Sequence, residues 1–126
     1  SSALIGVVAQ RMVRKVCPDC GRLLGAPVME RMVYKKEMGE DRTEFMYGAG
    51  CEMCANTGYR GRTGIFELLT MTDDLRMMIV DNAPQTKLRA QALKEGMITL
   101  MHDGMLKVKD DITNPAEVLR NTYSVE

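Results

Sequence analysis

The chain has 126 residues, of which 45% are hydrophobic and 27% charged, and its formal net charge is zero. This length allows one ordinary domain or two very small ones. The neutral charge argues against a protein that binds nucleic acid without regard to sequence, because such proteins need a surplus of Lys and Arg. No apolar run reaches the length of a membrane span, and the N-terminus lacks the basic region of a signal peptide. We therefore expect a cytosolic protein with reduced thiols.

The first half of the chain is predicted to mix helices and short strands. Residues 2–10 are apolar and are predicted as the end of a helix, and the alternation in residues 11–16 predicts a strand. Pro27 suits the first position of a helix, which is expected to stop near Gly39. A second strand is predicted at residues 43–48, where aromatic residues alternate with other types.

The second half is predicted to be helical after one more strand. Three glycines between residues 58 and 64 predict a loop, followed by a strand at 65–69. Capping residues, Pro and Gly then mark the ends of successive helices. These helices are expected to begin after the cap Thr72, to cover residues 86–95 and 99–109, and to begin again after the cap Asn114, with Glu117 completing a capping box.

The twelve Met residues and the one His have structural interpretations. Met is flexible and fills irregular gaps, so Met101 and Met105 are interpreted as core residues of their helix. The alternative is that the Met-rich helices form a docking groove for a partner protein. His102 lies away from any motif, and we interpret it as a surface residue rather than a catalytic base.

The four cysteines form two Cys-x-x-Cys pairs separated by thirty residues, Cys17 with Cys20 and Cys51 with Cys54. A disulfide scaffold would need an oxidising compartment, which nothing else indicates. A redox motif would be a single pair that opens a helix in a βαβ unit. Two such turns are instead typical of a tetrahedral metal site. Four protein ligands leave no open position for water or substrate, so the site is expected to be structural, with zinc favoured over iron.

The sequence resembles a known family over nearly its whole length. The runs AQRMVRKVCPDC and CEMCANTGYRGRTGIFELLTM, with TNPAEVLRNTY near the end, resemble the C-terminal region of the ATPases of bacterial type II secretion and type IV pilus assembly. The resemblance implies a parent protein that is a cytoplasmic hexameric ring, lies against the inner membrane through its partners, and uses ATP and Mg to power assembly. The implied partners are neighbouring subunits, an inner-membrane platform protein and other components of the machine, and no nucleic acid.

Together the patterns and the resemblance predict an α+β fold, with a small tetracysteine zinc module followed by a helical bundle. No Gly-x-x-x-x-Gly-Lys phosphate-binding loop occurs in the sequence, so the chain alone is expected to have no ATPase activity. The expected organisation is the tail end of a RecA-like domain (1–16), the metal-binding module (17–60), a glycine-rich loop and strand (61–71) and a C-terminal helical domain (72–126).

Arg62 and Arg60 flank Gly61 in a stretch that is among the most recognisable of the family. Alone they would be interpreted as solvated arginines, because exposed ion pairs contribute little. The resemblance makes Arg62, with Arg60 second, a candidate for the nucleotide pocket or the adjoining subunit interface of the parent ring, because arginines stabilise negative charge at such sites.

Two functions of other classes stay open at this stage. One is a thiol oxidoreductase, which would need an exposed thiol of depressed pKa. The other is a free-standing zinc-ribbon module that binds nucleic acid or protein through a basic face near the metal. The residues of that face would be Arg11, Arg14, Lys15, Arg22, Arg60 and Arg62.

Overall fold

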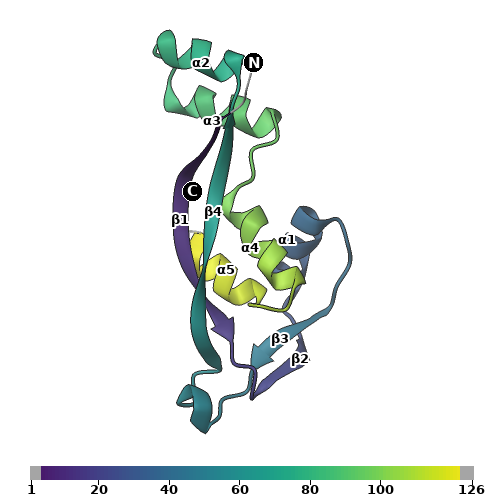
Figure 1. The fold of residues 1–126 in the computed structure, drawn as a ribbon. Helices are drawn as coiled ribbons and strands as arrows, with labels where there is room; N and C mark the ends of the chain where they lie inside the picture. Colours follow the sequence, from purple (N-terminus) through teal and green to yellow (C-terminus); the bar gives the residue numbers. More distant parts are fainter. Residues whose placement is uncertain (1–3, 123–126) are drawn as a thin grey trace.

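The computed structural model describes residues 4–122, and a long β-hairpin is its central feature (Figure 1). Strand β1 (Leu4–Val16) pairs antiparallel with β4 (Tyr59–Met71). The register runs from the pair Leu4 and Met71 to the pair Val16 and Tyr59. Because the two strands are so far apart in the sequence, everything from residue 17 to residue 58 is an insertion at one end of the hairpin.

The insertion contains a second, smaller hairpin with a helix in its connection. Strands β2 (Gly21–Gly25) and β3 (Glu44–Gly48) pair antiparallel, and α1 (Val28–Met38) lies between them in the sequence. A short 3-10 helix, η1 (Glu52–Cys54), follows β3. Helix α1 ends at Gly39, which adopts φ 71° and donates its N–H to the carbonyl of Lys35, as expected for a glycine cap.

In the part of the chain that the structure describes, four helices follow the long hairpin: α2 (Asp73–Val80), α3 (Gln85–Lys94), α4 (Leu100–Lys109) and α5 (Pro115–Thr122). Helix α2 begins where the Thr72 hydroxyl accepts a hydrogen bond from the backbone of Leu75. Helices α2 and α3 lie at the end of the hairpin far from the insertion, and α4 and α5 lie beside its middle (Figure 1).

The largest core cluster joins the insertion to the C-terminal helices. Tyr34 of α1 and Phe45 of β3 are fully buried, with ring centroids 5.0 Å apart in an edge-to-face arrangement. They pack in one cluster with Met105 and Val108 of α4 and Val118 of α5. The core therefore crosses residue 72, where the sequence predicted the start of a separate helical part. Met105 has the core role that the sequence predicted.

Most of the predicted elements are present, and three differences stand out. The described part of residues 2–10 is strand rather than helix, because residues 4–10 pair with β4. Residues 21–25 form a strand that the sequence did not indicate. The predicted glycine loop is also wrong, since β4 begins at Tyr59.

Gly61 takes φ 81° inside the strand, where β4 has one more residue than β1. The glycine therefore forms a bulge and does not end the pairing.

Candidate functional site

The structure brings the four cysteines together at the end of the long hairpin. Cys17 directly follows β1 and Cys20 directly precedes β2, whereas Cys51 precedes η1 and Cys54 is its last residue. All four Sγ atoms lie within 4.8 Å of one another. The Sγ distances are 3.8 Å from Cys17 to Cys51, 3.8 Å from Cys20 to Cys54 and 3.7 Å from Cys51 to Cys54.

These distances fit a tetrahedral metal ion. Four sulfur ligands at about 2.3 Å from a central zinc ion lie about 3.8 Å from one another. The donor set consists of four thiols, three of them buried, and Cys51 is half-buried. The tetracysteine cluster, Cys17, Cys20, Cys51 and Cys54, could therefore hold a metal ion without moving its sulfur atoms apart.

Backbone N–H groups surround two of the sulfur atoms. Gly50 donates its N–H to the Sγ of Cys20 at 3.3 Å. Cys54 Sγ accepts from the backbone N–H of Cys51 at 3.3 Å and from that of Gly58 at 3.2 Å. Hydrogen bonds to a thiolate stabilise its charged form, so the loops that follow β3 and η1 prepare the sulfur atoms to act as ligands.

The pKa values of two thiols are displaced in opposite directions. Burial raises the pKa of Cys54, but the backbone N–H groups of Gly58 and Cys51 outweigh it and lower the pKa to about 6. Burial raises the pKa of Cys20 to about 12, despite the N–H of Gly50. A bound cation would favour the deprotonated form of the Cys20 thiol, because metal ligation requires a thiolate.

Two glycines hold the two cysteine turns against each other. A Cβ atom on Gly48 would lie 2.0 Å from the carbonyl oxygen of Gly58. That same oxygen accepts a hydrogen bond from the backbone N–H of Cys17 at 3.0 Å. Gly58 also adopts φ 82°, which other residues rarely adopt. No pattern in the sequence indicated the contact between these glycines, one of which ends β3 while the other follows η1.

The structure places Arg60 and Arg62 in different surroundings. The Nη1 atom of Arg60 lies 3.3 Å from Oδ2 of Asp19, which belongs to the first cysteine turn. Arg62 is exposed and stands opposite Arg14 in the β1–β4 register. Within residues 4–122, the Arg62 side chain has no recorded hydrogen bond or ion pair. The two candidate arginines therefore do not converge on one pocket.

Glu117 is a buried carboxylate whose role the sequence did not predict. Its side chain is 1% exposed. Asn114 Oδ1 accepts a hydrogen bond from the backbone N–H of Glu117, but within residues 4–122 no hydrogen bond joins the Glu117 carboxylate to the backbone N–H of Asn114, as a capping box would need. The carboxylate accepts hydrogen bonds from the backbone N–H of Arg14 at 2.8 Å, from Arg14 Nη2 at 2.9 Å, and from Nε and Nη2 of Arg120 at 3.0 Å each. Burial raises the pKa of Glu117, but the two arginines outweigh it and lower the pKa to about 2. In the sequence, only the i,i+3 spacing of Glu117 and Arg120 on one helix could have indicated an ion pair at Glu117.

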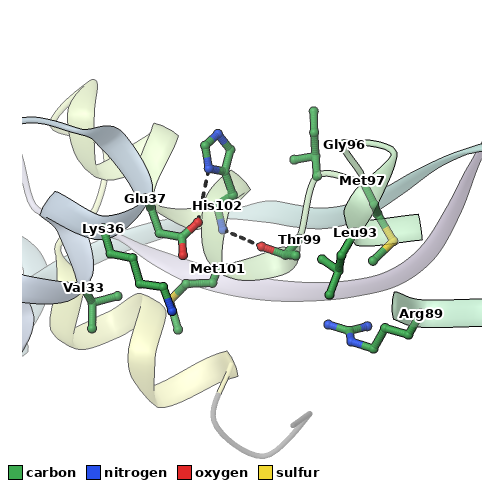
Figure 2. Close-up of a pocket in the computed structure, with 11 residues that line it drawn as sticks. Val33, Lys36, Glu37, Arg89, Leu93, Gly96, Met97, Thr99, Met101 and His102 are labelled. Atoms are coloured by element: carbon green, nitrogen blue, oxygen red, sulfur yellow. Dashed lines mark hydrogen bonds and ion pairs between the residues drawn. The ribbon is translucent and has the colours of Figure 1, made fainter. Parts of the chain in front are cut away.

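A second feature is a cavity of about 840 Å³ between α1, α3 and α4 (Figure 2). Its apolar lining includes Val33 and Met101, and its charged lining includes Glu37 and His102. His102 Nδ1 lies 3.2 Å from Oε1 of Glu37, so the histidine joins α4 to α1 at the protein surface. The interpretation of His102 as a residue without a catalytic role stays a prediction.

Comparison with known proteins identifies relatives over nearly the whole chain. A family model described as type II/IV secretion system protein matches residues 1–120. The chain is 40% identical over 97% of its length to the type IV pilus assembly ATPase PilB of Thermus thermophilus. It is 38% identical over 97% of its length to the type II secretion system ATPase E of Vibrio cholerae, and 36% identical over 95% to the protein transport protein HofB homolog of Escherichia coli.

The chain spans only a small share of these relatives. It covers 14% of the Thermus protein, 24% of the Vibrio protein and 25% of the Escherichia protein. Among residues 4–122, no helix has the length and apolar character needed to cross a membrane.

Proposed function

We propose that this chain, which belongs to the type II/IV secretion system protein family, is the C-terminal region of a cytoplasmic hexameric ATPase that powers type II secretion or type IV pilus assembly. The observation that carries the proposal is the family match over residues 1–120, together with relatives named as ATPases of both systems. In this proposal the neighbouring subunits of the ring and an inner-membrane platform protein are the partners, and ATP and Mg bind elsewhere in the parent protein.

Within that region, the tetracysteine cluster holds one structural zinc ion. The Sγ distances of 3.7–3.8 Å and the buried, all-sulfur donor set support zinc. Since all four positions are filled by the protein, the ion contributes to folding and does not activate water. The proposed organisation keeps a RecA-like tail at 1–16, the metal module at 17–60, a connection at 61–71 and a helical domain at 72–126.

Arg62 acts at the nucleotide pocket or at the adjoining subunit interface of the ring, and Arg60 contributes there to a lesser degree. The support is the exposed guanidinium of Arg62, which has no recorded partner within residues 4–122, on a strand that is fixed by pairing with β1. Arg60 has a partner in Asp19, so its charge is already balanced. A rigidly held guanidinium suits the recognition of phosphate or carboxylate groups.

ATP turnover of the full-length protein tests this function. In the metal-loaded protein, Arg62→Ala is expected to lower turnover by about a thousandfold, because an arginine that stabilises the transition-state charge of phosphoryl transfer is worth about 10³–10⁵ in kcat. Arg76→Ala, which removes an exposed arginine from α2, serves as the matched control and should leave turnover unchanged. Zinc content and thermal stability should be the same in all three proteins. Equal turnover in the Arg62→Ala and control proteins would refute the role of Arg62.

A further inference from the structure

Three arginines from separate elements line one cavity where β1, β4 and α5 meet. The cavity has a volume of about 580 Å³, and its lining includes Arg14 of β1, Arg62 of β4 and Arg120 of α5. Among residues 4–122, none of the residues that line it is acidic. Figure 1 shows α5 beside the two long strands at this position.

The positive charge of this arginine cavity is only partly balanced. Arg14 and Arg62 are direct cross-strand partners, an arrangement in which like charges destabilise a sheet. Glu117 lies behind the lining and neutralises one charge by accepting hydrogen bonds from Arg14 and Arg120. In the described part of the chain, three guanidinium groups against one carboxylate leave two positive charges in excess, so a ligand with two negative charges would complete the balance.

The guanidinium groups of Arg14 and Arg120 are held in place before any ligand binds. Both donate through Nε and Nη2 to Glu117. Arg14 also stacks on the Tyr59 ring, with its guanidinium carbon 4.1 Å from the ring centroid. Within residues 4–122, the Nη1 group of each has no recorded hydrogen bond. A fork of donors that is already oriented loses little freedom when it binds an oxyanion.

We propose that the arginine cavity binds a phosphoryl group, with Arg14, Arg62 and Arg120 as its ligands and Glu117 as the residue that positions two of them. A phosphate dianion matches both the excess charge and the bidentate geometry that arginine offers. The proposal deepens the proposed role of Arg62, because it names the ligand class and adds two arginines. This proposal rests on the proposed role of Arg62 in one respect only, the source of the phosphoryl group, which is either a nucleotide or free phosphate.

Arginine footprinting tests the site in the full-length, metal-loaded protein. Phenylglyoxal modification is followed by mass spectrometry, with inorganic phosphate present or replaced by chloride at equal ionic strength. Phosphate is expected to slow the modification of Arg62 and Arg120 about fivefold and to leave Arg76 unaffected, because bound oxyanions shield guanidinium groups whereas screening acts on all exposed charges. If ATP protects these arginines from modification at a lower concentration than phosphate does, a nucleotide is the source of the phosphoryl group. If ATP and phosphate protect them at equal concentrations, free phosphate is the source.

Variants establish whether the arginines act as one site. Arg120→Gln should raise the phosphate concentration that half-protects Arg62 about tenfold, since a bidentate charge-assisted contact is lost. Arg76→Gln should not change it. Equal modification of Arg62 with phosphate and with chloride, or equal protection of Arg76, would overturn the site. If Arg62→Ala leaves ATP turnover intact while phosphate still protects Arg120, the phosphoryl site stands and the proposed role of Arg62 in turnover is wrong.

Discussion

The clearest single test of how this fold is held together is the substitution Glu117→Gln. Gln has nearly the same shape as Glu, but it lacks the negative charge and presents N–H donors where Arg14 and Arg120 also donate. Glu117 is 1% exposed and joins α5 to β1 through both arginines. The substitution therefore weakens the attachment of α5 to the long hairpin without creating a cavity.

The magnitude follows from the pKa of Glu117. A shift from 4.5 in a free side chain to about 2 in the folded protein corresponds to about 3 kcal/mol of stability at neutral pH. Arg14 and Arg120 are 40% and 57% exposed, so solvent screening reduces the expected loss to about 2–3 kcal/mol. Because the pKa is lowered on folding, this contribution is complete above about pH 4.5 and is lost as the pH falls towards about 2.

Hydrogen exchange measures this loss locally in the full-length protein. Amides of α5 in the Glu117→Gln protein should exchange roughly 30 to 160 times faster than in the unsubstituted protein at pH 7. The ratio should be constant from about pH 6 to about pH 8, since the carboxylate stays ionised there. Glu44→Gln, on the exposed side of β3, is the control and should not alter the exchange of α5. An effect no larger than that of the control would refute the reasoning.

Three other predictions concern the metal centre and the isolated chain. Cys51→Ser should reduce the zinc content of the purified protein from one ion per chain to nearly none by mass spectrometry, and retention of the ion would contradict the proposed ligand set. Gly48→Ala should lower the free energy of unfolding by about 3 kcal/mol and speed zinc release to a chelator, because the new methyl group meets the backbone of Gly58. Gly25→Ala is the control and should release zinc at the normal rate, because the space around Gly25 is open. The 126-residue chain alone should release no phosphate from ATP above the buffer rate, and turnover like that of the full-length protein would exclude this proposal.

Local signals in the sequence were sufficient for the α-helices after residue 27 and for the grouping of the cysteines. Thr72 and Asn114 cap helices in the structure as their residue types predict, because a cap is decided within one turn of the chain. The Cys-x-x-Cys spacing likewise predicts that each pair converges, and a shared metal is the simplest reason for two such pairs. These features depend on residues close together in the sequence.

The features that were missed depend on residues far apart in the sequence. The apolar run at residues 4–8 has no clear period, and its strand conformation is decided by pairing with β4, more than fifty residues later. The residue type of Gly61 is typical of a loop, but β1 and β4 pair on both sides of it, so Gly61 forms a bulge within the strand. Glu117 lies 103 residues from Arg14, so the sequence could show only its contact with Arg120.

The placement of the metal centre determines what its loss would do to the rest of the fold. The pairing of Val16 with Tyr59, and the hydrogen bond from Cys17 to Gly58, already close the insertion at its base. A metal ion therefore adds little loop closure to the hairpin itself. The main effect of an ion bound there would be to fix the second cysteine turn and β3 against the first turn, close to Phe45 of the core shared with α4 and α5. Such an ion would couple the insertion to the C-terminal helices through packing, so its removal should loosen α1 and β3 before the β1–β4 hairpin.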